Sequence, residues 1–418
     1  MNKENEFDVN IRKNFERLSG GEYAINEVFR PADYDWPGDW EGRALLAFCC
    51  HYSITGKKTP CMDLMVSALG DKVNKQGFFG KEYNAELIDE QQLSGQSWYL
   101  RGLVLYARLF GSETALNYAR RTVHNLYLPA LEHYNGYPVD RRNVEGGVMG
   151  GQSGVMGNWL LSTDVGCAFV PLDGLAHYYH FTKDGALKEP LAKMIDKFME
   201  LDKAALKMQT HATLSATRGI LKFYEAVKEQ KYLKYAESIF DLYVREGMTL
   251  TYENFNWFGR RDTWTEPCAV ADSLILAIEL YKFTGKAAYK KYARRIWFNG
   301  LQFCQRANGG AGPNTCVTEE QPVLRVSMYE APFCCTMRYA EGLLFYHENK
   351  SFFGRETDKI VKEGGRYFLD DRLLVKDVNK VFPERKVFTA DGHDLILIPS
   401  LNTAFDKRAE QAYLKIVF

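Results

Sequence analysis

The chain has 418 residues, and its 46% of hydrophobic residues are enough for a large core and for more than one domain. Its 53 lysines and arginines balance 53 aspartates and glutamates, so no electrostatic argument favours binding to nucleic acid or an anionic membrane. The nine cysteines are not spaced like a secreted disulfide framework, and no apolar run is long enough to span a bilayer. The polar start, Met1 to Glu6, lacks the apolar core of a signal peptide. We therefore expect a cytoplasmic protein, with a trimmed secreted or periplasmic chain as the alternative.

Residues 1–36 are polar and are broken by Gly20-Gly21 and Pro31, so we expect a lead-in with at most one short helix. Helical periodicity then dominates over 37–350. An apolar helix that ends in a turn is predicted at 45–56, 99–111, 175–185, 214–230 and 274–285. A second, charged helix follows these turns at 112–126, 186–201, 231–246 and 286–303. Successive turns lie roughly 45 to 75 residues apart, which is typical of a repeat of helical hairpins.

The two helices of each hairpin differ in composition. The first is apolar on most faces, as over residues 273–278, whereas the second carries Lys, Arg and Glu. This asymmetry suits an inner ring of buried helices and an outer ring of half-exposed helices. Five hairpins and the helix after Cys335 therefore predict a mainly α fold, an (α/α)6 toroid barrel, over 37–350. An irregular helical solenoid is the alternative.

Residues 351–418 have a different pattern. Short apolar runs at 366–369, 373–375, 394–398 and 412–418 are separated by the pairs Gly364-Gly365, Asp370-Asp371 and Asp391-Gly392. These are strand and turn signals, and they predict a small β-rich C-terminal domain over 351–418.

Two cysteine motifs each come directly before a predicted helix. Cys334 and Cys335 open a helix over 339–346, and Glu266-Pro267-Cys268 comes before an apolar helix over 269–284. A thiolate at a helix start lies near the positive end of the backbone dipoles, which lowers its pKa. If both helices belong to the inner ring, their starts lie at the same end of the barrel. Glu266, Cys268, Cys334 and Cys335 then make a four-ligand zinc site.

The simpler interpretation is that these cysteines are ordinary core residues. Cys49-Cys50 has that pattern, because it lies within an apolar helical run and has no carboxylate partner nearby in sequence. We interpret that pair as core, and we also assign structural roles to the cysteines at 61, 167, 304 and 316.

The two cysteine motifs together resemble those of glycoside hydrolase family 127, the β-L-arabinofuranosidases. The resemblance implies an (α/α)6 barrel followed by β-domains, and zinc held by Glu266, Cys268, Cys334 and Cys335. It also implies that Cys334 is the nucleophile. The acid/base that best matches the family's Gly-Glu-Ala-Phe segment is Glu253, in Tyr252-Glu253-Asn254-Phe255, with Glu246 as the fallback.

Further positions are candidates for contact with a sugar. His211 resembles the family's His-x-Asn-Thr histidine, although a lone histidine is more often a structural residue. Gln96 stands in the region where the family carries a barrel histidine, so the preference for arabinose is open. Acidic and aromatic side chains complete the predicted substrate-binding set, because flat rings stack on sugars: Asp39, Trp40, Glu41, Trp98, Trp264 and Tyr329.

The sequence and the resemblance favour a zinc-dependent retaining glycoside hydrolase that uses a zinc-bound cysteine on plant-type glycans. The expected partner is a carbohydrate, without nucleic acid or membrane, and a homodimer is compatible with this prediction. Two alternatives remain. One is another (α/α)6 carbohydrate-active enzyme, a lyase or an unsaturated-sugar hydrolase. The other is a non-catalytic sugar-binding homologue with structural zinc.

Overall fold

A computed structural model describes residues 6–29, 36–141, 150–354, 359–380, 382, 385–398 and 413–418. The chain forms two compact units. The α-unit comprises Leu18–Glu246 and Trp257–Arg260, and the mixed unit comprises Met1–Arg17, Gly247–Asn256 and Arg261–Phe418. Both units are discontinuous in sequence, and the predicted domain boundaries at 36 and 350 stay predictions.

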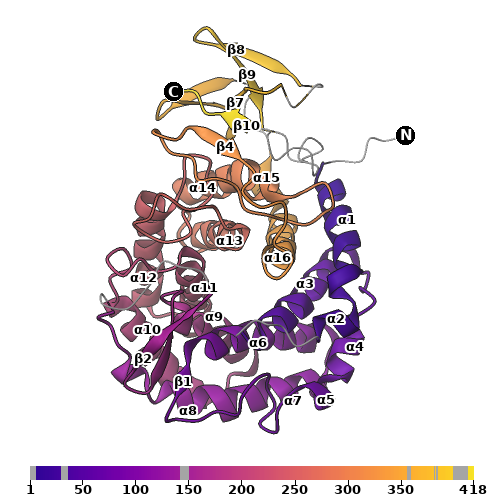
Figure 1. Cartoon of the computed structure of the whole chain (residues 1–418), viewed down its shortest axis with the longest axis vertical. Coiled ribbons are helices and arrows are strands. Elements are labelled where there is room, and N and C mark those ends of the chain that lie inside the picture. Colours follow the sequence, from indigo (N-terminus) through magenta and orange to yellow (C-terminus); the bar gives the residue numbers. More distant parts are fainter. Residues whose placement is uncertain are drawn as a thin grey trace. The chain divides into compact units, whose positions relative to one another are not determined.

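The α-unit is built mainly from helices (Figure 1). Its α-helices are α2 (Ile25–Val28), α3 (Asp39–Thr55), α4 (Met62–Ser67), α5 (Leu69–Lys72), α6 (Glu90–Phe110), α7 (Glu113–Thr122), α8 (Leu128–Leu131), α9 (Pro171–Thr182), α10 (Lys188–Glu200), α11 (Thr210–Val227) and α12 (Gln230–Leu242). Shorter helical segments are η1 (Gly21–Tyr23), η2 (Val123–Tyr127), η3 (Tyr134–Gly136), η4 (Cys167–Phe169), η5 (Gly185–Leu187) and η6 (Tyr243–Gly247). A three-stranded sheet has the order β1 (Ile88–Asp89), β3 (Trp159–Ser162), β2 (Gln152–Met156).

Local chemistry explains where the long helices begin and end. The Asp89 side chain caps α6 by accepting hydrogen bonds from two backbone N–H groups of its first turn. Helices α3 and α6 end at Gly56 and Gly111, which have positive φ angles of 69° and 61°, a conformation that glycine adopts without a steric penalty. The predicted turns at these two positions are therefore confirmed.

Glycines allow the apolar helices of the α-unit to pack closely. A Cβ atom on Gly42 of α3 would lie 2.0 Å from the backbone nitrogen of Tyr99 in α6. A Cβ atom on Gly219 of α11 would lie 2.3 Å from the carbonyl carbon of Leu172 in α9. Helix α6 also packs on α9, so α3, α6, α9 and α11 form a continuous series of neighbours. These four helices correspond to the first four of the five predicted apolar helices.

The mixed unit combines helices with one sheet. Its helices are α1 (Glu6–Leu18), α13 (Pro267–Thr284), α14 (Ala287–Arg295), η7 (Ile296–Leu301), α15 (Gln302–Cys304), α16 (Cys335–Glu348) and η8 (Lys350–Phe353). The strands are β4 (Val323–Arg325), β5 (Ile360–Glu363), β6 (Arg366–Leu369), β7 (Arg372–Asp377), β8 (Val387–Ala390), β9 (His393–Leu397) and β10 (Tyr413–Lys415). The main path of the sheet has the order β4-β10-β7-β6-β5, and β9 pairs with both β7 and β8.

The sheet contains the predicted C-terminal strands and three strands that were not predicted, β4, β5 and β8. Its turns pass through Asp370-Asp371 and Asp391-Gly392, all with positive φ angles, as their sequence indicated. A small core of Tyr367, Leu374 and Leu395 covers one face of the sheet. Strand β4 comes from before α16 and pairs with β10, so the sheet also takes in a segment from upstream of residue 351.

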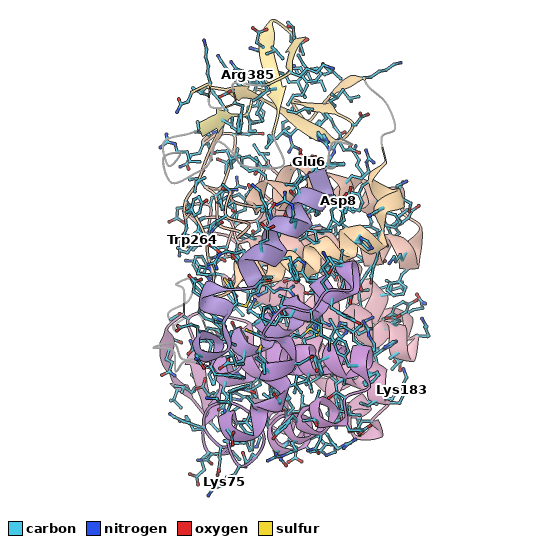
Figure 2. The ribbon with its side chains drawn as sticks, turned by 90° about the vertical axis from the view of Figure 1, so that its right-hand side faces the viewer. Glu6, Asp8, Lys75, Lys183, Trp264 and Arg385 are labelled. Carbon is cyan, nitrogen blue, oxygen red and sulfur yellow. The ribbon has the colours of Figure 1, made fainter. Side chains whose placement is uncertain are left out.

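Helix α1 is longer than the sequence analysis anticipated. It spans 13 residues, with acidic Glu6 and Asp8 in its first turn (Figure 2). Phe7 and Ile11 are buried and lie four residues apart, which places both on one face of the helix. The Phe7 ring packs against Tyr346 of α16 at a centroid distance of 4.5 Å. The first part of the chain is therefore a packed element of the mixed unit.

A cavity of about 230 Å³ lies in the α-unit beside the start of α6. Two polar side chains of its wall bind backbone: Asp89 caps α6, and Gln92 Nε2 donates to the Lys81 carbonyl at 2.6 Å. None of the predicted site residues lines this cavity. Within the described ranges, no helix combines the length and the apolar character needed to cross a membrane.

Candidate active site

The two cysteine motifs lie at the starts of two neighbouring helices of the mixed unit (Figure 1). Glu266 is the residue before α13, and Pro267 occupies the first helical position, where its missing N–H group is not needed. Cys334 is the residue before α16 and has φ −147° and ψ −63°. Cys335 is the first residue of α16. One turn further along, Arg338 of α16 forms a buried ion pair with Asp272 of α13, so the two helices run side by side in the same direction.

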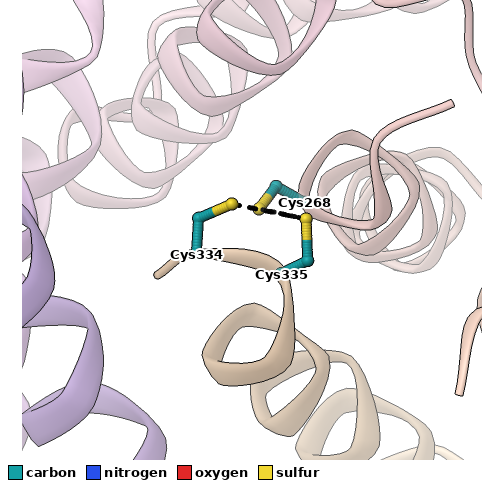
Figure 3. Close-up of side chains that lie close together, drawn as sticks. All are labelled: Cys268, Cys334 and Cys335. Carbon is teal, nitrogen blue, oxygen red and sulfur yellow. Dashed lines mark hydrogen bonds between the residues drawn. The ribbon is translucent and has the colours of Figure 1, made fainter. Parts of the chain in front are cut away.

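Three sulfur atoms meet where these helices begin (Figure 3). The Sγ atom of Cys335 lies 3.7 Å from that of Cys268 and 3.4 Å from that of Cys334. All three sulfurs lie within 4.8 Å of one another, and a carboxylate oxygen of Glu266 lies within 4.8 Å of the Cys268 sulfur. Cys268 and Cys335 are buried, whereas Cys334 is half-buried. All nine cysteines fall in the described ranges, and none of them forms a disulfide.

This donor set fits a zinc ion. Zinc prefers four tetrahedral ligands, and a Zn–S bond of about 2.3 Å places two thiolates of one site about 3.8 Å apart. The observed sulfur separations of 3.4 and 3.7 Å are close to that value. Burial raises the pKa of Cys335 well above its ordinary value, and the neighbouring thiols of Cys268 and Cys334 raise it further. A bound cation has the opposite effect, because it stabilises the thiolate form of its ligands.

Glu253 lies fully buried in a network of neutral hydrogen-bond donors. Its Oε1 atom accepts from Asn314 Nδ2 at 2.8 Å and from Thr265 Oγ1 at 3.0 Å. Its Oε2 atom accepts from Thr251 Oγ1 at 2.9 Å. The Cys304 sulfur lies 3.8 Å from Oε1. Thr265 directly precedes Glu266, so the network that holds Glu253 adjoins the metal motif in sequence.

Burial controls the protonation of Glu253. Loss of water raises the pKa of its carboxyl from 4.5 to about 7, although the hydrogen bonds from Asn314, Thr251 and Thr265 lower it. Arg306, also fully buried, donates from Nη2 to Asn314 Oδ1 at 2.9 Å. This bond orients the Asn314 amide so that its nitrogen faces Glu253. A carboxyl with a pKa near 7 can both donate and accept a proton at neutral pH.

A second polar cluster lies in the α-unit. Arg43 Nε donates to Asp39 Oδ2 at 2.8 Å, and Arg43 Nη2 donates to His211 Nε2 at 3.3 Å. The Arg43 guanidinium lies 4.1 Å from the centre of the Trp98 ring, and His211 stacks on the same ring at 5.6 Å. All four side chains are buried. The helices α3, α6 and α11 therefore bring Asp39, Trp98 and His211 together, as three of the predicted substrate-binding residues.

The contacts of His211 determine its tautomer. A guanidinium only donates hydrogen bonds, so His211 Nε2 must accept the bond from Arg43. The proton of the neutral ring then lies on Nδ1, which donates to Ser215 Oγ at 3.3 Å. By accepting this hydrogen bond, His211 helps to orient the Arg43 guanidinium.

The other predicted contact residues have more local surroundings. Gln96 Nε2 donates to the carbonyls of Pro37 at 2.6 Å and Phe79 at 3.0 Å, so its amide binds backbone. Burial raises the pKa of Glu41 from 4.5 to about 7. Trp40 lies 6.5 Å from the Tyr23 ring. Two residues lie in the mixed unit: Trp264 (Figure 2), whose backbone bridges to Thr315, and Tyr329, whose carbonyl accepts from Arg306 Nε at 2.7 Å.

No protein-family model and no curated protein sequence matches this chain. Solved structures do match. A GH127 β-arabinofuranosidase aligns with 91% of this chain and 65% of its own, with a TM-score of 0.55 and 13% identity. The cellobiose 2-epimerase of Bacillus thermoamylovorans aligns with 82% of this chain and 98% of its own (TM-score 0.57, 15% identity). An unsaturated glucuronyl hydrolase specific for heparin aligns with 83% and 98%, respectively (TM-score 0.55, 11% identity).

The chain has an (α/α)6 fold. The predicted fold class, mainly α with a small C-terminal β region, is therefore confirmed. The same fold is found in glycoside hydrolases and in other carbohydrate-active enzymes, so it does not by itself select one reaction. The chain spans 65% of the length of the GH127 structure, and that likeness supports the fold of the family without showing membership.

The sequence analysis missed residues that complete both clusters. Arg43 stands four residues after Asp39 on α3, a spacing that places the two side chains on one helix face and could have been noticed. Asn314 and Arg306 carried no such signal, because they reach Glu253 from a segment without regular structure. Glu246, the fallback acid/base, falls within η6 in the segment that ends the α-unit.

Proposed function

We propose that this protein is a zinc-dependent retaining glycoside hydrolase in which Cys334 is the nucleophile. The observation that carries the proposal is the group of three sulfurs at the starts of α13 and α16, of which only Cys334 is half-buried. Two buried thiols suit permanent metal ligands, and the more accessible third thiol suits attack on a substrate. Glu266, Cys268, Cys334 and Cys335 would hold the zinc.

Cys334 and Glu253 would have separate roles in the reaction, as nucleophile and as acid/base. Zinc, when bound, supplies the charge that keeps its cysteine ligands deprotonated at neutral pH. The Cys334 sulfur attacks the anomeric carbon and forms a C–S bond while the bond to the leaving oxygen breaks. Glu253 gives its proton to that oxygen, then takes a proton from the water that breaks the C–S bond. Ordinary retaining glycosidases use a carboxylate as the nucleophile in the same two-step scheme.

The proposed substrate is the terminal furanose-like sugar of a plant-type glycan. Support comes from the likeness to a structure named as a GH127 β-arabinofuranosidase and from the zinc-type donor set. The cluster of Asp39, Arg43, Trp98 and His211 would contact the sugar, because aromatic faces stack on sugar rings and charged groups bind hydroxyls. Glu41, Trp40, Gln96, Trp264 and Tyr329 stay proposed contacts.

A covalent trap tests the nucleophile. Wild-type protein is incubated with a furanosyl epoxide or haloacetamide and examined by intact mass and peptide mapping. We expect one label per chain on Cys334, and loss of hydrolysis of nitrophenyl furanosides. Cys334→Ala should take no label and lose activity by on the order of 10³-fold or more. The matched control is Cys316→Ala, which removes another buried thiol of the mixed unit. This variant should keep both the label on Cys334 and the hydrolytic activity. Full activity of Cys334→Ala contradicts the assignment.

A second candidate is another carbohydrate-active enzyme with the same fold. It is favoured by the alignments with the cellobiose 2-epimerase and the unsaturated glucuronyl hydrolase, which each cover 98% of those chains. Such an enzyme would not use a zinc-bound thiolate. Activity on an unsaturated or reducing-end sugar that survives complete removal of zinc would select this candidate. A protein that binds zinc and sugar without turnover and without labelling of Cys334 would instead be a non-catalytic homologue.

A further inference from the structure

Helix α1 is bonded to the backbone beside the cysteine pair. Asn14 Nδ2 donates to the carbonyl of Thr336 at 3.2 Å and to the carbonyl of Gly309 at 3.0 Å. Asn14 and Thr336 are fully buried. Thr336 directly follows Cys335 in the chain, so one side chain of α1 holds the peptide next to a proposed metal ligand.

A second contact from α1 reaches the same segment. Arg17 Nε donates to both carboxylate oxygens of Glu330, at 2.9 and 3.2 Å. Glu330 also accepts from Thr336 Oγ1 at 2.8 Å. The Thr336 hydroxyl in turn accepts from the Ala311 N–H at 3.0 Å. Two side chains of α1 therefore reach Thr336, one directly and one through Glu330.

The fit between α1 and this segment is close. A Cβ atom on Gly309 would lie 2.1 Å from the Lys13 carbonyl oxygen, and Gly309 has a φ of +88°. Lys13 Nζ donates to the neighbouring carbonyl of Ala307 at 3.3 Å. Gln305 Nε2 donates back to the Asn10 carbonyl of α1 at 2.9 Å. The contact is thus continuous along α1, and the backbone cannot move there without breaking several buried hydrogen bonds.

We propose that Asn14 and Arg17 are positioning residues for the metal centre, so that the N-terminal helix sets the affinity for zinc. We call these two residues the α1 clamp. This inference rests on the proposed zinc site, and it adds to that site an element more than 300 residues before Cys335 in sequence.

The position of α1 should affect zinc affinity strongly, because a metal site requires accurate placement of its ligands. Ligand distances in a metal site tolerate only about 0.2 Å of deviation. At the start of α16 the backbone N–H groups lack intrahelical acceptors, and the Thr336 N–H donates instead to the Ala331 carbonyl at 3.2 Å. The clamp adds a fixed donor to the Thr336 carbonyl and, through Glu330, a fixed acceptor for the Thr336 hydroxyl. Loss of the partners that orient metal ligands typically lowers metal affinity by 10–100-fold.

The test compares zinc affinity among metal-free variants of the whole chain. Asn14→Leu keeps the γ-branched shape of the side chain and removes both donated hydrogen bonds, and Arg17→Gln removes the charge that holds Glu330. Arg12→Ala is the matched control, because Arg12 lies on the same helix and its ion pair with Glu16 is exposed to solvent. Each protein competes with a chromophoric chelator for zinc. We expect the apparent Kd to rise by about 10-fold or more in Asn14→Leu and Arg17→Gln, and to stay unchanged in Arg12→Ala.

Cobalt provides a readout that a merely structural role would not change. Cobalt in place of zinc should give the absorption of a tetrahedral thiolate site in wild type, with altered bands in Asn14→Leu. Lower thermal stability of metal-free Asn14→Leu with wild-type zinc affinity and cobalt spectrum would overturn the proposal. If Asn14→Leu does not fold, the zinc affinity of Arg17→Gln decides, because the Arg17 side chain is partly exposed, at 14%. A wild-type chain that binds no zinc refutes the proposed function instead, which separates the two failures.

Discussion

The sulfur of Cys268 lies 3.7 Å from the sulfur of Cys335, although 67 residues separate them in the chain. The helices that carry them start side by side, and the buried pair of Asp272 and Arg338 holds their next turn. This arrangement brings two thiols from distant segments close enough for one ion. Protein contacts between the two helices contribute to holding this arrangement.

We predict that Cys268→Ala and Cys335→Ala lose the metal. Each variant removes one of the four proposed ligands, and zinc prefers four tetrahedral ligands. Elemental analysis of protein purified in the presence of zinc should find about one zinc per chain in wild type and a small fraction of that in each variant.

The matched control for this measurement is Cys50→Ala. Cys50 is equally buried and also belongs to an adjacent cysteine pair, but it lies inside α3. Its zinc content should equal that of wild type. Equal zinc in Cys268→Ala and wild type would mean that the ion, if bound, lies elsewhere.

The sequence was sufficient for the parts of the site that depend on local signals. Glu266-Pro267-Cys268 and Cys334-Cys335 stand directly before helices, and Pro267 is a helix-start signal that can be seen without a structure. Gly56 and Gly111 marked the ends of α3 and α6 for the same reason, whereas α9 ends at Thr182, before the predicted turn at Gly185. Contacts made across the fold could not be predicted in this way. Arg43 and His211, for example, are 168 residues apart, and only the packing of α3, α6 and α11 makes them partners.

The role of Glu253 could be predicted only in part from the sequence. The resemblance selected it by a short motif, but no local signal showed that it would be fully buried or that Thr251, Thr265 and Asn314 would hold it. Helix α1, which carries the α1 clamp, was not predicted at its full length, although the four-residue spacing of Phe7 and Ile11 is a helical signal. The sequence could not reveal that this helix would bind the segment around Thr336.

We predict that Glu253 makes the stability of the fold depend on pH. Its pKa is raised from 4.5 to about 7 on folding, so the folded chain binds the proton more tightly than the unfolded chain. The carboxyl therefore contributes stability below pH 4.5, and this contribution is lost as the pH rises through 7. As the pH rises from 4.5 to about 7, the unfolding free energy of wild type should fall relative to that of Glu253→Gln, by on the order of 3 kcal/mol at most. Urea unfolding across that range measures it, and a constant difference would contradict the raised pKa.

The amide of Asn314 should tune the same titration. Its hydrogen bond at 2.8 Å favours the charged form of Glu253, so Asn314→Leu should raise the pKa of Glu253 further. If Glu253 is the catalytic acid, kcat/KM should fall above neutral pH in wild type, and the fall should move to higher pH in Asn314→Leu. The pH dependence of kcat/KM on the best nitrophenyl furanoside checks this. If kcat/KM of Asn314→Leu fell at a lower pH than that of wild type, the Asn314 amide would not favour the charged form of Glu253.

Arg43 and Asp39 should be strongly coupled, because both are buried and they lie 2.8 Å apart. Removing one partner of a buried ion pair leaves the other charge without compensation and typically destabilises a protein by about 3–5 kcal/mol. We therefore expect Arg43→Met and Asp39→Asn each to lower the unfolding free energy by that order, and the double variant to lose clearly less than the sum. The exposed pair of Arg12 and Glu16 is the matched control, with an expected coupling below about 0.5 kcal/mol. Additive losses at Arg43 and Asp39 would mean that the stacking on Trp98, rather than the ion pair, holds the guanidinium in this cluster.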